Sequence, residues 1–185
     1  LGWRGIRVTL DHPEIFLAQV RAMLKANEGL GNLRIMLPMV SNVSEIDEAL
    51  ELIHRSHREL QQDGLTQGLP PIGVMVEVPA AVSQAQAMAR RVQFLSVGSN
   101  DLTQYLLAVD RNNPRVADLY HSLHPAVLQA LIKIAVACRE AAVAVAESSA
   151  AQQPPAPDEP LLRALLAAEA SRLSARGREA LEARA

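Results

Sequence analysis

The sequence predicts an α/β fold built on a parallel β-sheet. Short apolar runs rich in β-forming residues alternate with longer amphipathic segments, an order typical of parallel strands joined by helices. The run over residues 72–78 (IGVMVEV) is almost entirely apolar, as expected of a strand buried on both faces. Two architectures fit this pattern, an open doubly wound sheet and a (β/α)8 barrel, and both place function at the carboxyl ends of the strands.

Each element is indicated by its own local signals. Asp11 and Pro13 suit the start of a helix, and Ser44 with Asp47 resembles a capping box at the start of another. We expect strands over residues 5–10, 33–40, 72–78, 93–98 and 142–146, and helices over residues 13–26, 44–60, 80–91, 101–109 and 124–141. Five strands are too few to close a barrel of eight, so a barrel requires the chain to be a piece of one.

The composition changes near residue 147. The segment ESSAAQQPPAPDEP is typical of a linker, and the Ala-, Arg- and Glu-rich residues after it fit a lone amphipathic helix. The chain of 185 residues is long enough to bury one core. We therefore expect one partial barrel domain over residues 1–146 and a helical or disordered tail over residues 147–185.

Charge and composition exclude several classes of function. Eighteen Lys and Arg against 20 Asp and Glu leave a net charge of −2, and aromatic residues make up only 3%. A general nucleic-acid or anionic-membrane surface needs a basic excess, and single-strand binding needs aromatic platforms. One cysteine fits a reducing compartment, and the sequence contains neither a membrane span nor a signal peptide pattern. We expect a cytoplasmic protein without nucleic-acid or membrane partners.

Two acidic residues at strand ends form the strongest candidate site. Glu77 closes the third expected strand, and Asp101 follows the fourth. Adjacent parallel strands lie about 4.8 Å apart, so carboxylates at matching ends can share one cation. Oxygen ligands suit Mg²⁺ or Mn²⁺, with water and substrate completing the coordination. The alternatives are a solvated or capping role for Glu77 and a helix cap for Asp101.

Three arginines are candidates for binding an anion near this pair. Arg7 and Arg34 belong to the first two expected strands, and Arg111 follows the fourth βα unit. The guanidinium group offers a forked set of donors that matches phosphate or carboxylate oxygens. For any one of them, a surface position or an ion pair with Asp or Glu is the competing interpretation.

The other reactive residues are weaker candidates for a functional site. His54 and His57 lie three apart on a polar helix face, which favours a solvated surface over a metal site, and Cys138 suits an inert helix core. The sequence has neither GxGxxG nor a phosphate loop ending in GK[ST], so no motif supports nucleotide binding.

Five segments in order resemble one known family. They are LGWRGIR, LRIMLPMV, GVMVEVPAA, FLSVGSNDLTQYLLAVDRNN and LYHSLHPAVL, over residues 1 to about 140. Together they resemble the phosphoenolpyruvate (PEP)-binding domain of the PEP-utilising enzymes, and among these Enzyme I, the PEP–protein phosphotransferase of the bacterial phosphotransferase system.

The resemblance implies a (β/α)8 barrel, a Mg²⁺ ion held by Glu77 and Asp101, and PEP held by Arg7, Arg34, Asn100 and Arg111. It implies transfer of the phosphoryl group of PEP to a histidine in a separate N-terminal domain and onward to a phosphocarrier protein, with release of pyruvate. It also implies a homodimer in intact members.

The sequence departs from the family after residue 140. Members carry a Gly-Cys-Gly-Glu motif whose cysteine protonates the enolate of pyruvate, whereas this chain reads AVAVAESSAAQQPPAP. We therefore expect no catalytic residue of that kind and no turnover from the isolated chain. Two alternatives stay open: a non-catalytic remnant that binds Mg²⁺ or an anion, and a fragment of PEP synthase or pyruvate phosphate dikinase. A partial barrel also leaves open strand edges, which favours marginal stability or aggregation.

Overall fold

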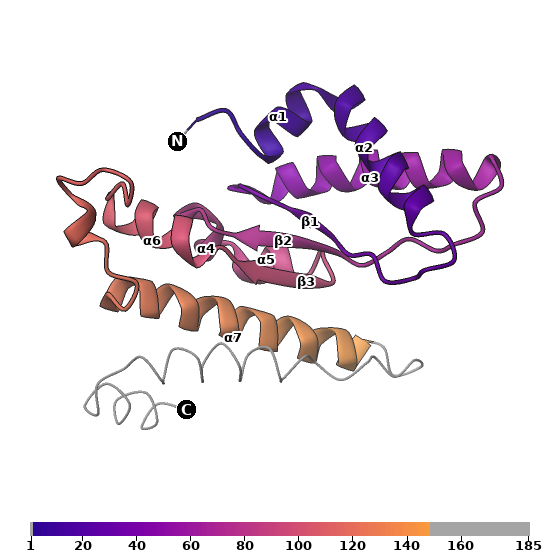
Figure 1. Ribbon diagram of the computed structural model, residues 1–185. Helices are drawn as coiled ribbons and strands as arrows, with labels where there is room; N and C mark the ends of the chain where they lie inside the picture. The colour runs from indigo at the N-terminus through magenta and orange to yellow at the C-terminus, as the bar shows by residue number, and fades with distance from the viewer. Residues whose placement is uncertain (1, 149–185) are drawn as a thin grey trace. The chain divides into compact units, whose positions relative to one another are not determined.

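A three-stranded parallel sheet forms the centre of the fold. The computed structural model describes residues 2–148, with side chains to residue 141, and the chain as far as Ala141 forms one compact unit. The strands are β1 (Ile35–Leu37), β2 (Ile72–Val76) and β3 (Phe94–Val97), in that order across the sheet (Figure 1). The helices are α1 (Ile6–Asp11), α2 (Pro13–Ala26), α3 (Val43–Gln62), α4 (Pro79–Ser83), α5 (Ala85–Ala89), α6 (Ser99–Leu107) and α7 (Pro125–Ser148), with a 3₁₀ turn η1 (Ala117–Leu119).

The predicted α/β class with a parallel sheet is confirmed, and the central strand is the apolar run that indicated it. Gly73, Val74 and Val76 of β2 are buried, because β2 pairs with β1 on one side and with β3 on the other. Among the described residues, β1 and β3 each pair with β2 alone. The barrel, the domain boundary at residue 146 and the expected tendency to aggregate stay predictions.

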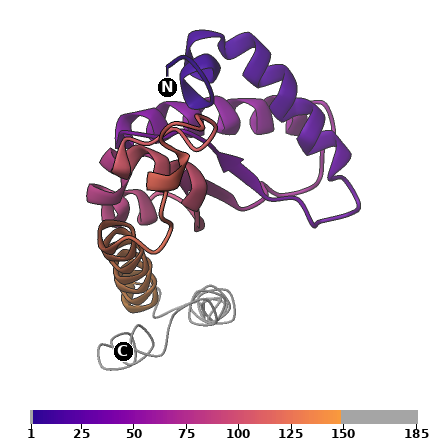
Figure 2. The same cartoon turned by 60° about the vertical axis from the view of Figure 1, so that its left-hand side comes forward.

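Helices cover both faces of the sheet. Helices α1, α2 and α3 lie on one side, and α7 as far as Ala141 lies on the other (Figures 1 and 2). Helix α2 packs on α3, and α1 packs on both. The core draws on all these layers, with buried apolar residues that include Val20, Ile46, Ile53, Val74, Leu102 and Ile134. The strands all run toward α4 and α6 (Figure 1), so the residues that follow the strands gather at this end.

The prediction of a strand over residues 5–10 is wrong, because this segment forms helix α1. Gly5 has a φ of +59°, which turns the chain into the helix. The backbone N–H of Ile6 donates to the carbonyl of Pro38 (3.1 Å), and Ile6 is completely buried. These tertiary contacts override the β propensity of the β-branched residues.

The prediction of a fifth strand over residues 142–146 is also wrong, because these residues lie within α7. Their alanine content favours a helix, and the sequence offers no Gly or Pro there to end one. The tail predicted over residues 147–185 lies outside the described residues from residue 149 onward.

Two further helix predictions are corrected in detail. The capping box of α3 uses Asn42 and Glu45 rather than Ser44 and Asp47, since the Asp47 carboxylate pairs with Arg91 (2.8 Å). The helix predicted over residues 80–91 is divided at Gln84 into α4 and α5. The Gln84 amide donates to the Ser41 carbonyl (2.9 Å), which ties this break to the start of α3.

Candidate functional site

The two predicted acidic residues lie at the carboxyl ends of neighbouring strands. Glu77 follows β2 directly, and Asp101 lies in the first turn of α6, which begins two residues after β3 ends. The register pairs Val76 with Val97, so Glu77 stands opposite Gly98. Asp101 forms no side-chain cap on α6, so the capping interpretation does not hold for it. Glu77 is only 4% exposed, so it is not a solvated carboxylate either.

Gly98 makes room for the Glu77 side chain. A Cβ atom at residue 98 would lie 2.7 Å from the Glu77 Cβ, 2.8 Å from Oε2 and 3.0 Å from the Met75 sulfur. Contacts this short require one of the neighbours to move. The absence of a side chain at residue 98 therefore lets the Glu77 carboxylate lie against the start of α6.

Met39 holds the other oxygen of this carboxylate. Its backbone N–H donates to Oε1 of Glu77 over 2.6 Å, and its φ of +60° is unusual for a residue with a side chain. Such backbone strain costs about 1–3 kcal/mol and persists where the surroundings enforce it. Here a Cβ at Gly5 would clash with the Met39 side chain at 2.8 Å, so α1 packs closely against this turn. The strained turn directs a donor at the carboxylate.

The surroundings of Glu77 oppose its negative charge. Burial raises the pKa of its carboxyl above the ordinary value of 4.5, and the negative charge of Asp101 raises this pKa further. The Met39 N–H and the positive charge of Arg4 act in the opposite direction. A buried carboxylate beside a second one is an arrangement that a bound cation would stabilise.

Two arginines from distant parts of the chain pair with Asp101. The Arg111 Nη1 lies 3.0 Å from Oδ1, and the Arg4 Nη2 lies 3.5 Å from Oδ2. The Asp101 side chain is 13% exposed, whereas those of Arg111 and Arg4 are 38% and 54% exposed. The result is a cluster of two acidic and two basic side chains at the carboxyl end of the sheet.

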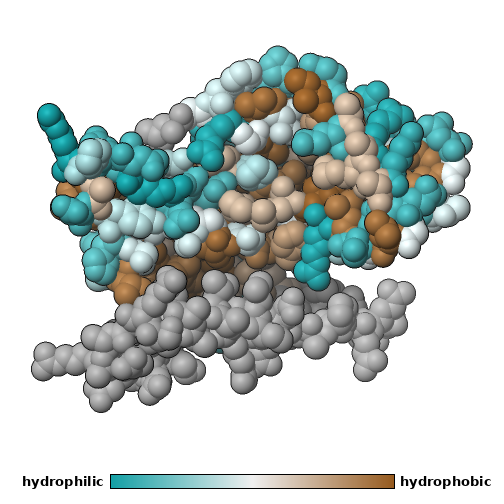
Figure 3. Space-filling view, in the orientation of Figure 1, coloured by the Kyte–Doolittle hydropathy of each residue, from teal (hydrophilic) through white to brown (hydrophobic). Residues whose placement is uncertain are grey.

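The loop after α6 brings Arg111 back to Asp101. Ala108 ends the helix with a φ of +54°, and the Asp110 side chain accepts a hydrogen bond from the backbone N–H of Asn112 (2.9 Å). The Gln104 side chain holds the backbone N–H of Arg111 (3.2 Å). Figure 3 shows hydrophilic side chains gathered at this end, over α6 and the loop that follows it.

Asn100 is oriented by a tyrosine. The Tyr120 hydroxyl donates to Oδ1 of Asn100 (3.2 Å) and lies 3.3 Å from its backbone carbonyl. With Oδ1 engaged in this way, the amide N–H₂ is the donor that Asn100 can offer to a ligand. The exposed Asn100 stands one residue before Asp101, so this donor belongs to the same edge of the sheet.

The structure does not bring the other two predicted arginines to the carboxylates. Arg7 lies on α1, and its guanidinium donates to the carbonyl of Gly2 (2.8 Å). Arg34 precedes β1, at the amino end of the sheet, where its guanidinium lies 5.8 Å from the centre of the Phe94 ring. Neither forms any of the ion pairs found among the described residues.

Sequence reasoning missed Arg4 and Met39. Arg4 lies in the same WRGIR segment as Arg7, but the strand predicted over residues 5–10 includes Arg7 and leaves Arg4 outside it. A helix beginning at Ile6 leaves Arg4 in the preceding segment, free to reach Asp101. The contribution of Met39 is a backbone N–H, which residue types do not reveal.

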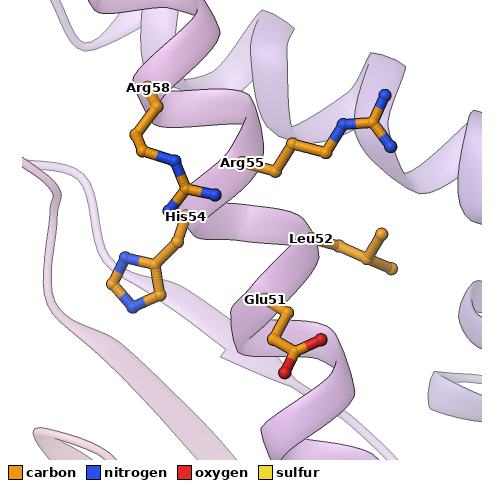
Figure 4. A pocket seen from close by; sticks show the side chains of 5 residues that line it. All are labelled: Glu51, Leu52, His54, Arg55 and Arg58. Carbon is orange, nitrogen blue, oxygen red and sulfur yellow. The ribbon is translucent and has the colours of Figure 1, made fainter.

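The remaining candidates lie elsewhere. His54 lines a surface depression on α3 with Glu51, Leu52, Arg55 and Arg58 (Figure 4), and none of the residues of the acidic and basic cluster lines it. His57 is 3.0 Å from the carbonyl of Gln67, in a contact between elements of the fold. Burial raises the pKa of the half-buried Cys138 thiol, as expected of an unreactive cysteine. Among the side chains described up to residue 141, no three from His, Cys, Asp or Glu converge as a metal site. None of the helices that the structure describes has the length and apolarity that a bilayer span requires.

The close approach at Gly98 leads to a testable prediction. Replacing Gly98 with alanine is expected to displace Glu77 and to lower the free energy of unfolding by about 1–3 kcal/mol, the range typical of overpacked cores. Gly68→Ala is a matched control, because a Cβ there meets nothing within 4 Å. Urea denaturation followed by circular dichroism measures both variants. Equal stabilities for the two would show that residue 98 does not constrain Glu77.

The chain is similar to several known proteins. The family model for the PEP-utilising enzymes, PEP-binding domain, matches residues 1–185. The chain is 61% identical over 136 residues to a "Phosphoenolpyruvate-dependent phosphotransferase system" protein of Escherichia coli K12, covering 73% of this chain and 18% of that protein. It is 47% identical to a phosphoenolpyruvate-protein phosphotransferase of Haemophilus influenzae, covering 69% of this chain and 22% of that protein.

Two further proteins are similar to the chain at lower identity. A probable phosphoenolpyruvate synthase of Pyrococcus horikoshii is 42% identical over 76% of this chain and 17% of its own length. Among solved structures, a citrate lyase from Burkholderia xenovorans LB400 aligns with a TM-score of 0.53 and 27% identity, over 68% of this chain and 38% of that chain. The chain spans about a fifth of the length of the curated relatives it matches. It belongs to the family of PEP-utilising enzymes and matches their PEP-binding domain.

Proposed function

We propose that the chain is the PEP-binding portion of a phosphoenolpyruvate–protein phosphotransferase. The observation that supports this most is the placement of Glu77 and Asp101 at adjacent strand ends, with Arg4 and Arg111 on Asp101. Relatives that carry this activity in their names are 61% and 47% identical to the chain. In the intact protein, the phosphoryl group would pass from PEP to a histidine of another domain and onward to a phosphocarrier protein, and pyruvate would be released.

The donor set suits Mg²⁺. Glu77 and Asp101 supply carboxylate oxygens, the ligands that this hard cation prefers, and Mg²⁺ in phosphate sites usually takes only one or two carboxylates. Two acidic side chains without a third His, Cys, Asp or Glu among the described residues match that pattern. We propose that these two side chains hold Mg²⁺, whose charge would stabilise negative charge on the transferring phosphoryl group.

The protein's own groups would bind and orient PEP. Arg4 and Arg111 each carry a forked guanidinium that can hold a phosphate or a carboxylate through two parallel hydrogen bonds. The amide of Asn100, oriented by Tyr120, would donate to a phosphoryl oxygen. Holding both ends of PEP in this way fixes its position relative to an incoming histidine. The Gly-Cys-Gly-Glu motif is absent from the sequence, so we expect binding without turnover.

A second candidate is a fragment of a PEP synthase, which the 42% identity to the Pyrococcus relative supports. The same metal and anion site would serve either enzyme, because PEP is the substrate of a PEP–protein phosphotransferase and the product of a PEP synthase. A third candidate, a remnant that only binds, predicts the same ligand binding and no transfer in any assembly. The phosphotransferase is favoured by the higher identities of its named relatives.

Ligand-dependent stability tests the binding step of this proposal. We expect Mg²⁺ and PEP together to raise the Tm of the full chain by several degrees, since a ligand at 100 times its Kd adds about 2.7 kcal/mol. PEP in the presence of EDTA should give a much smaller shift. No shift with both ligands, or an equal shift in EDTA, would contradict the proposed site.

Phosphorylation in trans separates the candidates. The chain is mixed with ³²P-labelled PEP and the N-terminal histidine domain of a phosphotransferase, or with the corresponding domain of a PEP synthase. Label on the first domain supports the phosphotransferase, and label on the second alone supports the synthase. The chain of 185 residues should bind PEP without transferring label, so the comparison is made with a chain completed with the family's final strands. No label on either domain with the completed chain would support the remnant that only binds.

A further inference from the structure

Both oxygens of the Asp101 carboxylate already face a cation supplied by the protein. Arg111 lies 3.0 Å from Oδ1 and Arg4 lies 3.5 Å from Oδ2. Asp101 forms no side-chain cap on α6 that would compete with these pairs. The oxygens that would bind a metal ion are therefore the same ones that hold the two arginines.

Binding of a divalent ion to these oxygens is less favourable while the arginines stay paired with them. Mg²⁺ binds a carboxylate oxygen at about 2.1 Å, which places its two positive charges within a few ångströms of each guanidinium. Repulsion between these charges is strong in a partly buried site. Metal binding should therefore loosen both arginines from Asp101, and their 38% and 54% exposure leaves them space to move.

A ligand with two anionic groups would receive the displaced arginines. A guanidinium forms its strongest hydrogen bonds with carboxylate and phosphate oxygens. Such a ligand, bound beside the metal, replaces the Asp101 carboxylate as the partner of each arginine and cancels their repulsion from the ion. Metal and anion would then each favour the binding of the other.

We propose that Arg4 and Arg111 are exchangeable counter-cations of Asp101. In the empty site they pair with Asp101 and compete with the divalent ion. When the ion and the anionic ligand bind together, both arginines pair with the ligand instead. This inference rests on the proposed function. It adds that the cooperativity between metal and PEP arises from these two arginines. By linkage, the factor by which PEP tightens the metal equals the factor by which the metal tightens PEP.

If this exchange occurs, removing one of the two arginines should increase the affinity for the metal ion alone. Without Arg111, Asp101 meets the ion with one competitor fewer, so Arg111→Ala should bind Mn²⁺ alone about threefold more tightly than the wild type, which is the scale of a partly exposed ion pair. Arg4→Ala should act in the same direction but more weakly, because its pair is longer and more exposed. Arg111→Lys keeps the charge and should bind Mn²⁺ much as the wild type does.

The experiment measures Mn²⁺ binding to the full chain by electron paramagnetic resonance, with and without saturating PEP. Arg115→Ala is the matched control, because Arg115 lies in the same exposed loop and forms none of the ion pairs among the described residues. We expect PEP to increase the affinity for Mn²⁺ by about tenfold or more in the wild type, which is within the range of typical couplings between two sites. In Arg111→Ala the increase should be less than about threefold, below that range. Circular dichroism confirms that each variant is folded.

Three outcomes would contradict the inference. If Arg111→Ala binds Mn²⁺ alone no more tightly than the wild type does, Arg111 does not compete with the ion. That result would contradict the exchange of arginines but not the proposed metal site. An equal tightening in Arg115→Ala would assign the effect to overall charge and would also overturn the exchange. A wild type that binds no Mn²⁺ in either condition would overturn the proposed function together with the inference.

Discussion

Replacing Asp101 with asparagine is expected to abolish the rise in Tm that Mg²⁺ and PEP together give to the wild-type chain. The change removes the charged oxygen that would face the ion and the carboxylate that pairs with Arg4 and Arg111. These pairs are partly exposed, so their loss should lower the free energy of unfolding by no more than about 1 kcal/mol. Binding should fall further, by about tenfold or more in Mg²⁺ affinity, because one of the two protein ligands is lost. Thermal unfolding with both ligands measures the effect.

Asp118→Asn provides the control for this prediction. Asp118 is an exposed aspartate in the 3₁₀ turn η1, so the substitution makes the same change of charge outside the site. The control should keep the full shift in Tm. A full shift in Asp101→Asn would show that Asp101 does not hold the ion.

Replacing Glu77 with glutamine is expected to change how stability depends on pH. Burial and the charge of Asp101 raise the pKa of the Glu77 carboxyl above 4.5 in the folded chain. A group whose pKa is raised on folding stabilises the folded state below its unfolded pKa, and this contribution is lost as pH rises through the folded pKa. Glutamine is neutral at every pH and escapes this loss, and its amide oxygen can still accept from the Met39 N–H.

Without divalent ions, Glu77→Gln and the wild type should therefore be similarly stable below about pH 4.5, and the variant should become the more stable one as pH rises toward neutrality. Urea denaturation in EDTA from pH 4 to pH 8 measures the difference. The exposed Glu51 of α3 provides the control, since Glu51→Gln should follow the wild-type curve. Added Mg²⁺ should stabilise the wild type and leave Glu77→Gln unchanged. A wild type more stable than the variant by the same amount at every pH would contradict the account.

The sequence was most informative where local pattern and tertiary structure agree. The apolar run that forms β2, bounded by Pro71 and Pro79, had to be buried wherever it lay in the fold. Strand β3 and the helix after it followed from the same alternation. Helix α1 could not be predicted in this way, because its residues favour a strand, whereas tertiary contacts such as the hydrogen bond from Ile6 to Pro38 and the packing on α2 and α3 accompany the helix.

The candidate site also contains residues that the sequence pattern predicts and residues that it does not. Glu77, Asp101 and Arg111 lie near strand or helix ends that the pattern located to within two residues. Arg4 depends on the conformation of the segment before α1, which the sequence pattern misassigned. The hydrogen bond from Met39 and the space at Gly98 are properties of the packed backbone, and they became visible only in three dimensions.

The central claim is that Glu77 and Asp101 hold one divalent ion between them. Mn²⁺ titration by electron paramagnetic resonance tests this claim directly on the wild type, Glu77→Gln, Asp101→Asn and the double variant. The account predicts one ion per chain in the wild type, a loss of affinity of about tenfold or more in each single variant, and little further loss in the double variant, because the two ligands act on one ion. Wild-type affinity in either single variant, or losses that simply add in the double variant, would show that the two carboxylates do not share an ion.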